Sequence, residues 1–490
     1  MSRSLLKNPM TLRSGKYSGL PGKDRRESRP HCTAALLTSF LFGLFVAAAP
    51  GSTLLDPFPE PSTTQFGRTA ISLGDVNGDG VADLAIAAPF QDGDFVTFQI
   101  GFGVPQNVGK VFVVDGVSLA VLSIMTDPEF DLVQKQHFGG QLGASLAVSA
   151  DINGDGIPDL IAGVPHHIEN PDDPEAIINQ AGKALVFSGK DGTLLLTLKD
   201  PTAEEDGRFG TAVAALSDVN SDGTADFAVG VPGKDIGGEE GVANVGLTYI
   251  FSGKDGSLLR TLNDPPRGGD EAGAAFGSAV ANAGDIDSDG TSDIAVGAPG
   301  EGRVYVFSGK AGGLLYSIVS PVVDTMPSFG AAVAGGQDFN RDRKPDLVIG
   351  APFANHKQGA AYLYNGLDGT LIRTLRPPAF QLHARFGASV FASPDLTGDR
   401  RGDAIVGAPG QNVSEFKGAG EAFVYNGSNG KLFRTLVSAT PQAHAGFGLG
   451  LAASVFPGSR TAIPIIGAPY QDAVIDSLTH LQIGQIEIVP

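Results

Sequence analysis

Oxygen-bearing side chains recur at fixed spacing in a glycine-rich segment near the start of the chain. Residues 75–83 run Asp-Val-Asn-Gly-Asp-Gly-Val-Ala-Asp. Side-chain oxygens stand at positions 1, 3, 5 and 9, position 7 can offer its backbone carbonyl, and the glycine at position 6 allows a sharp turn. Without a cation, carboxylates at this spacing would repel one another. The pattern therefore predicts an oxygen-only Ca²⁺ site.

Three further copies keep the whole pattern, so we expect four calcium sites. The expected ligands are Asp75, Asn77, Asp79, Val81 and Asp83; Asp151, Asn153, Asp155, Ile157 and Asp159; Asp218, Asn220, Asp222, Thr224 and Asp226; and Asp285, Asp287, Asp289, Thr291 and Asp293. An EF-hand would also need a bidentate acid at position 12. That position holds Ile86, Ala162, Val229 and Val296, within strand-like runs, which excludes EF-hands.

A fifth and a sixth copy depart from the pattern. Their candidate ligands are Asp338, Asn340, Asp342 and Asp346, and Asp395, Thr397, Asp399 and Asp403. Arg343 and Lys344 follow the acids of the fifth loop, and Arg400 and Arg401 those of the sixth. Basic side chains could neutralise these carboxylates in place of a metal, so both alternatives stay open for two further calcium sites. The seventh copy, residues 456–459, has no acids and is expected to be metal-free.

Each loop lies inside a repeated unit. A unit opens with Phe-Gly or Leu-Gly and closes on a proline 23 positions later, and the seventh is one residue shorter. The seven units are 66–89, 142–165, 209–232, 276–299, 329–352, 386–409 and 447–469. Two more strand-like runs bounded by Gly and Asp-Gly follow most units, for example 182–189 and 191–198. Each repeat is therefore expected to form four antiparallel strands, with the metal loop between strands one and two.

Units of this size must stack on neighbours to bury both faces of their sheets. Closing seven of them in a ring predicts an all-β, seven-bladed β-propeller. The final segment, 484–490, has the pattern of a third strand, and residues 51–58 have that of a fourth. We therefore expect residues 51–58 to be a closing strand that completes the last blade.

The sevenfold combination of Phe-Gly, an aspartate-rich loop and Gly-Ala-Pro resembles the FG-GAP repeats of the integrin α-subunit N-terminal β-propeller. The resemblance covers nearly the whole chain after residue 49. It implies a head that binds ligands and partners, with Ca²⁺ stiffening the blades on the face away from the ligand. No leg domain, membrane span or cytoplasmic tail follows the repeats in this sequence. We therefore expect a free-standing or surface-held adhesion or ligand-binding module instead of a signalling receptor.

The first 49 residues differ from the rest. A basic stretch precedes the uncharged apolar run 33–49, and Pro50-Gly51 follows. This is typical of a secretory signal peptide, and an uncleaved N-terminal anchor is the alternative. Residues 50–490 would then form the propeller. The one cysteine, Cys32, lies in the leader, so no disulfide is expected in the mature protein. We expect a secreted, cell-surface or periplasmic protein, in contact with a membrane only through an uncleaved anchor.

The formal net charge is −19, which disfavours nucleic acid and anionic membranes as partners. We expect a monomer that binds an extracellular protein or glycan. The sequence has no nucleophile elbow, zinc-binding helix or phosphate loop, so no enzyme is expected. A lectin-like glycan-binding propeller is the nearer alternative. A hydrolase or lyase built from the long loops 90–108, 166–181 and 233–245 is the more distant one.

The connections on the face opposite the metal loops carry the remaining candidate ligand-binding residues. Seven histidines are expected there, at positions 137, 166, 167, 356, 383, 444 and 480, as ligand or transition-metal groups or as ordinary loop polarity. Long loops on blades one to three, beside a nearly bare fourth blade at Gly300–Gly302, predict a binding groove on this face. Arg401-Gly402-Asp403 matches the tripeptide that integrins recognise. Because Asp403 occupies position 9 of a metal loop, we interpret this match as coincidence.

Overall fold

The computed structural model describes residues 52–55, 64–91, 96–98, 101–103, 107–129, 139–169, 176–236, 242–266, 272–322, 328–455, 461–476, 479–482 and 485–489. The chain divides into two compact units, Met1–Gly43 and Leu44–Pro490. The first unit, and with it most of the expected leader, lies outside the described residues.

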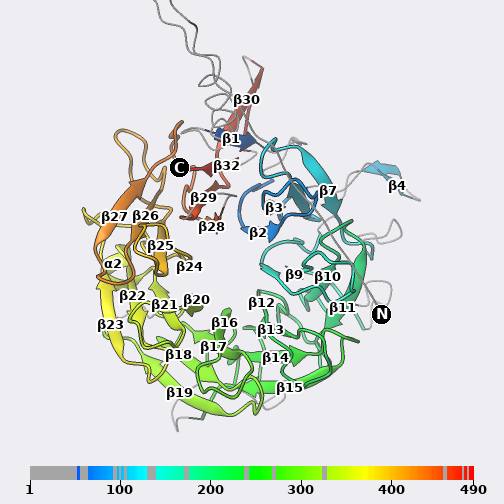
Figure 1. Ribbon diagram of the computed structural model, residues 1–490. Helices are drawn as coiled ribbons and strands as arrows, with labels where there is room; N and C mark the ends of the chain where they lie inside the picture. Colours follow the sequence, from blue (N-terminus) through cyan, green and yellow to red (C-terminus); the bar gives the residue numbers. More distant parts are fainter. Residues whose placement is uncertain are drawn as a thin grey trace, which may run out of the picture. The chain divides into compact units, whose positions relative to one another are not determined.

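The second unit is a seven-bladed β-propeller of four-stranded antiparallel sheets arranged in a ring (Figure 1), which confirms the predicted fold class. The first strands of neighbouring blades contact one another around the centre, where they line a cavity of about 800 Å³. From first to fourth strand, the blades are β2 (Ala70–Gly74), β3 (Asp83–Ala88), β6 (Lys110–Val114) and β7 (Val121–Met125); β8 (Leu146–Val148), β9 (Leu160–Val164), β10 (Lys183–Phe187) and β11 (Leu194–Lys199); β12 (Ala212–Ala215), β13 (Phe227–Val231), β14 (Leu247–Phe251) and β15 (Leu258–Asn263); β16 (Ala279–Gly284), β17 (Asp293–Ala298), β18 (Arg303–Phe307) and β19 (Leu314–Val319); β20 (Ala332–Gln337), β21 (Asp346–Ala351), β22 (Ala360–Tyr364) and β23 (Leu371–Leu375); β24 (Ser389–Ser393), β25 (Asp403–Ala408), β26 (Glu421–Tyr425) and β27 (Leu432–Leu436); and β28 (Gly450–Ser454), β29 (Ile463–Ala468), β32 (Gln485–Ile488) and β1 (Ser52–Leu55).

The seventh blade combines strands from both ends of the described chain. Its outer strand is β1, within the segment where a closing strand is expected, and β1 pairs antiparallel with β32. The register runs from Ser52 opposite Ile488 to Leu55 opposite Gln485. The contact between the last blade and the first therefore depends on a sheet whose outermost strand comes from the start of the chain.

The glycines of the repeat signature are the points of closest approach between blades. A Cβ on Gly230, in the second strand of blade three, would lie 2.0 Å from the carbonyl oxygen of Gly277, which opens blade four. The same contact at Gly467 and Gly67, at 1.9 Å, joins blade seven to blade one. Only glycine allows two backbones this close. The other contacts of this kind are Gly163 to Gly210, Gly297 to Gly330, Gly350 to Gly387 and Gly407 to Gly448.

The opening phenylalanines fill the space between blades. Seven hydrophobic clusters each combine buried residues of two neighbouring blades, and one of them joins blades seven and one. Phe276 is fully buried and lies edge-on to Phe307, with ring centroids 5.9 Å apart. An aromatic ring at six of the seven opening positions, with Leu142 at the remaining one, buries a large apolar area and anchors each interface in the same place.

Irregular connections lie between the second and third strands. The hairpin β4 (Val96–Phe98) and β5 (Gly101–Gly103) follows the second strand of blade one, and β30 (Asp472–Asp476) and β31 (Thr479–Gln482) follow that of blade seven. Blade five has the short helix α2 (Ala354–Lys357) in this place. Among the described residues, no helix has the length and apolar character needed to cross a membrane.

Candidate functional site

Six loops between first and second strands share one backbone shape. In the first loop, Gly78 and Gly80, at positions 4 and 6, have φ values of 81° and 87°. In the fifth loop the same two positions hold Arg341 and Arg343, with φ values of 73° and 70°. The loss of glycine therefore leaves the turn in place, although a side chain in the left-handed region costs free energy.

The aspartate at position 9 anchors each loop. The Oδ2 atom of Asp83 accepts hydrogen bonds from the backbone N–H groups of Val76 and Asn77, at 2.8 and 3.3 Å. Its Oδ1 atom accepts one from the N–H of Gly116, at 2.9 Å, in the turn between β6 and β7. The equivalent residues Asp159, Asp226, Asp293, Asp346 and Asp403 are likewise fully buried and bonded to the equivalent turn.

Burial makes these anchoring carboxyls weaker acids than ordinary aspartates. Desolvation raises the pKa of all six, to about 6 for Asp293 and about 7 for Asp346, against the opposing effect of the backbone hydrogen bonds. A divalent cation beside them would favour the charged form.

Three carboxylates converge in the fourth loop. Asp285, Asp287 and Asp289 each offer an oxygen within 4.8 Å of the others. Asp285 also accepts hydrogen bonds from the backbone N–H groups of Asp289 and Gly290, at 3.1 and 3.2 Å. The donor set is oxygen only, with no sulfur or imidazole, and this chemistry fits Ca²⁺. In the other five loops an amide or a hydroxyl stands at position 3.

Side chains from the turn between strands three and four contact the aspartate at position 5 of three loops. Ser188 Oγ donates to Asp155 Oδ2 at 3.1 Å, and Lys190 Nζ donates to the carbonyl of Asp155 at 3.4 Å. The same contacts recur at Ser252 and Lys254, and at Ser308 and Lys310. Our sequence interpretation did not include these residues. The recurring Ser-Gly-Lys at 188–190, 252–254 and 308–310 was the signal for them.

The basic residues of the fifth and sixth loops do not pair with the acids beside them. Within these two fully described loops, no ion pair joins Arg343, Lys344, Arg400 or Arg401 to a loop carboxylate. Lys344 Nζ instead donates to the carbonyl of Asp285 in the fourth loop, at 2.9 Å, and to the hydroxyl of Ser288. The basic side chains of these two loops therefore do not neutralise the loop carboxylates by direct contact.

The Arg401-Gly402-Asp403 tripeptide is not presented as a ligand. Asp403 is fully buried and accepts hydrogen bonds from the N–H groups of Leu396, Thr397 and Gly427, at 2.7, 2.8 and 3.0 Å. Its carboxylate is thus committed to the loop and to the neighbouring turn.

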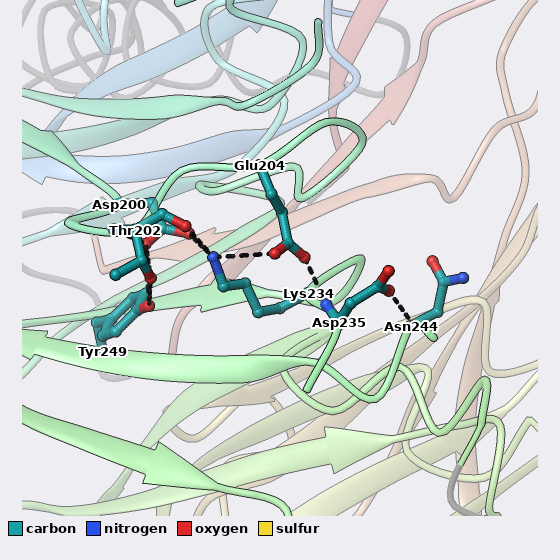
Figure 2. Close-up of polar contacts among 7 residues, drawn as sticks. All are labelled: Asp200, Thr202, Glu204, Lys234, Asp235, Asn244 and Tyr249. Carbon is teal, nitrogen blue, oxygen red and sulfur yellow. Dashed lines mark hydrogen bonds and ion pairs between the residues drawn. The ribbon is translucent and has the colours of Figure 1, made fainter. Parts of the chain in front are cut away.

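Buried ion pairs connect neighbouring blades on the opposite face. Figure 2 shows Lys234 reaching Asp200 at 3.1 Å and Glu204 at 3.3 Å, while Tyr249 donates to Asp200 at 2.9 Å. Asp200 follows the last strand of blade two, and Lys234 and Tyr249 belong to blade three. Between blades one and two, Lys183 makes equivalent contacts with Asp127 and Glu129, at 2.9 and 2.8 Å.

The histidines fall into separate environments. His166 Nδ1 lies 2.7 Å from Gln180 Oε1, and burial together with Lys183 lowers the pKa of His167 to about 3. His356 lies in α2, and His383 and His444 line a common cavity. His137 and the side chain of His480 lie outside the described residues. The described histidines therefore do not form one metal site.

The chain forms a seven-bladed β-propeller in which five of the repeats are FG-GAP repeats. The model of the FG-GAP repeat family matches residues 67–114, 142–183, 209–251, 276–307 and 329–364. The sixth and seventh repeats, whose loops depart most from the pattern, lie outside the matched segments.

Curated relatives are integrin α subunits. Integrin alpha-V of Gallus gallus is 34% identical over 225 residues, covering 43% of this chain and 20% of its own. Integrin alpha pat-2 of Caenorhabditis briggsae is 29% identical, covering 46% of this chain and 19% of its own. Integrin alpha-4 of Xenopus laevis is 27% identical, covering 50% and 22%. This chain thus spans about a fifth of the length of the relatives it matches.

Proposed function

We propose that the protein is an extracellular, non-catalytic adhesion or ligand-binding module whose blades are stabilised by Ca²⁺. The observation that carries this proposal is the contrast between the two faces. One face repeats a single carboxylate-lined loop six times, while the other presents connections of different length and sequence. A rigid scaffold with variable loops is the usual basis of recognition. The similarity to integrin α subunits supports the same role.

We assign calcium to loops one to four, with ligands at positions 1, 3, 5, 7 and 9. The three converging carboxylates of Asp285, Asp287 and Asp289 favour this assignment most directly. Loops five and six keep the loop shape and the acids at positions 1, 5 and 9. We propose that they bind Ca²⁺ more weakly, because Arg343 and Arg400 bring positive charge to the glycine position.

We place the partner's site on the opposite face, in a groove beside the short connection of blade four. Ala298 and Arg303 bound this connection, while the connections of blades one and three are long. The partner is an extracellular protein, and a glycan is the second candidate because the same loops could present hydrogen-bonding groups to sugars.

The test has two stages. The purified chain is first screened against arrays of extracellular-matrix proteins and of glycans in millimolar Ca²⁺, and the best ligand is taken forward. Short turns are then grafted in place of 90–108 and 233–245. We expect the graft to abolish binding of that ligand and to leave the calcium-dependent melting temperature unchanged. Full binding by the grafted protein would place the site elsewhere, and an absence of ligands on both arrays would contradict a binding role.

A further inference from the structure

A cavity of about 770 Å³ opens over blades six, seven and one, on the face opposite the calcium loops. Its lining includes Arg68, Arg385 and Lys417 together with His383, His444 and Tyr470. None of the described residues that line it is an aspartate or a glutamate. Three cationic side chains in one acid-free cavity are unexpected in a chain with a net charge of −19.

The cationic groups of this cavity contact neutral partners among the described residues. The Arg68 guanidinium donates to two neutral acceptors, Gln65 Oε1 and the Tyr470 hydroxyl, both at 3.1 Å. The Arg385 guanidinium lies 5.9 Å from the centre of the Phe353 ring. Among the described residues, no carboxylate lies within ion-pairing distance of Arg68, Arg385 or Lys417. Arg385 and Lys417 are exposed, so their charge is accessible to an anionic group entering the cavity.

Three side chains of the cavity lie on left-handed backbone. His383, Arg385 and His444 have φ values of 65°, 56° and 64°, in the left-handed region that favours glycine. Glycine serves in the corresponding place of blade four, where Gly273 has a φ of 71° and open space around it. The same left-handed turn occurs away from the cavity, for example at Arg208 and Ala275, so it belongs to the repeat and places these side chains without marking a ligand site by itself.

The hydroxyl of Tyr470 adds a directed donor. Because its oxygen accepts from Arg68, its own proton is available to another acceptor. Arg68 belongs to blade one and Tyr470 to blade seven, so the pair also fixes the wall of the cavity across the ring closure. The lining thus combines fixed positive charge with neutral hydrogen-bonding groups, in a volume typical of small-ligand pockets.

We propose that this cavity binds an acidic saccharide through its carboxylate or sulfate groups. Arginine forks bind either oxyanion with two parallel hydrogen bonds, while the imidazoles and the tyrosine hydroxyl suit sugar hydroxyls. A concave pocket of this size fits a few sugar units better than a protein, which needs a broad and flatter surface. The inference rests on the proposed binding role of this face, but its site is separate from the groove beside blade four.

The test is titration calorimetry of the full chain in millimolar Ca²⁺. A heparin tetrasaccharide supplies the sulfate arm, tetragalacturonate the carboxylate arm, and maltotetraose the neutral control. We expect at least one acidic probe to bind, with an affinity that falls as salt rises. Arg385→Gln and Lys417→Gln should each weaken binding about tenfold, equivalent to about 1.4 kcal/mol, and the double variant should abolish it.

Arg208→Gln is the matched control. Arg208 has an equally left-handed φ of 58° at the corresponding place of blade three, but it is paired with Asp206. We expect this variant to bind the probe normally. The proposal is overturned if neither acidic probe binds, if maltotetraose binds as tightly, if the cavity variants bind unchanged, or if a glutamate-rich peptide binds the same residues more tightly.

A further arm separates this proposal from the proposed function. The protein grafted at 90–108 and 233–245 should keep its affinity for the acidic tetrasaccharide, because the cavity includes neither segment. Loss of saccharide binding in that graft, with its melting temperature unchanged, would contradict the cavity assignment alone. Retained saccharide binding with retained binding of the array ligand would contradict the groove alone.

Discussion

Lys234 Nζ and Asp200 Oδ2 lie 3.1 Å apart, and the two side chains are 6% and 1% exposed. The pair joins blade two to blade three at the face that carries the irregular connections (Figure 2). A charge held this far from water is tolerated only while its partner remains. Lys183 and Asp127 repeat the arrangement one interface earlier, with Lys183 fully buried.

Asp200→Ala should destabilise the protein strongly. The substitution leaves the Lys234 ammonium buried with only the partly exposed Glu204 as an ionic partner, and it removes the acceptor of the Tyr249 hydroxyl. We expect a loss of about 3 kcal/mol in the free energy of unfolding, measured by denaturant titration. Asp206→Ala is the control, because the Asp206–Arg208 pair is half-exposed and should contribute less than about 1 kcal/mol. Equal effects of the two substitutions would show that burial is irrelevant here.

Removal of calcium should lower the melting temperature. Binding to the native state alone stabilises it by about 2.7 kcal/mol for each site at a ligand concentration of 100 times Kd. The melt is compared in EDTA and in millimolar Ca²⁺, and identical midpoints would rule out the metal assignment. In calorimetric titrations, Asp155→Ala should lower the stoichiometry by one site. Ser459→Ala, in the seventh loop, should leave it unchanged.

Arg343→Gly should stabilise the fifth loop and strengthen its calcium site. Glycine removes the cost of a left-handed side chain, about 1 kcal/mol, and it also removes a positive charge from the loop. The free energy of unfolding in EDTA measures the first effect, and calcium titration measures the second. The reciprocal change, Gly290→Arg in the fourth loop, should reverse both signs. A destabilising effect of Arg343→Gly would contradict the strain argument.

Deletion of residues 51–58 should destabilise the ring and promote association. Without β1, the backbone edge of β32 is left unpaired, and an open strand edge is a template for other chains. Melting temperature and light scattering are compared between chains that begin at Gly51 and at Pro59. A monomeric Pro59 chain with an unchanged melt would show that β1 is dispensable.

The repeated parts of the fold were predictable because the same physical requirement recurs in every blade. The close contact of Gly230 with Gly277 tolerates no side chain, and the buried ring of Phe276 has counterparts in five other repeats, with Leu142 in the remaining one. These residues therefore stand at constant spacing, and counting them gave seven blades. The loop acids were visible in the sequence for the same reason.

The features that do not repeat were not predictable. The β4–β5 hairpin lies in a connection whose length and sequence differ from blade to blade, and the lysine of the buried ion pair belongs to β10 in the case of Lys183 but follows β13 in the case of Lys234. Arg343 replaces the glycine at position 6 of the fifth loop, and the sequence left open whether such basic side chains neutralise the acids in place of a metal. The turn persists because the Arg343 N–H donates to Asp338 Oδ2 at 3.0 Å, the bond that Gly80 makes to Asp75 at 2.8 Å. Contacts of the main chain thus outweigh the preference of one side chain.

The pairing of Ser52 with Ile488 determines how the ring responds to tension. The strand β1 begins where β32 ends, so a pull applied before Ser52 and after Ile488 acts on adjacent ends of two antiparallel strands. Such a pull breaks their hydrogen bonds one after another, beginning at Ser52, whereas a shearing load would strain all of them together. Force applied at these two ends acts first on the pairing of β1 with β32, and not on the interfaces between the other blades. We expect the ring to open under force at its seventh blade, by peeling of β1, before any calcium loop is loaded.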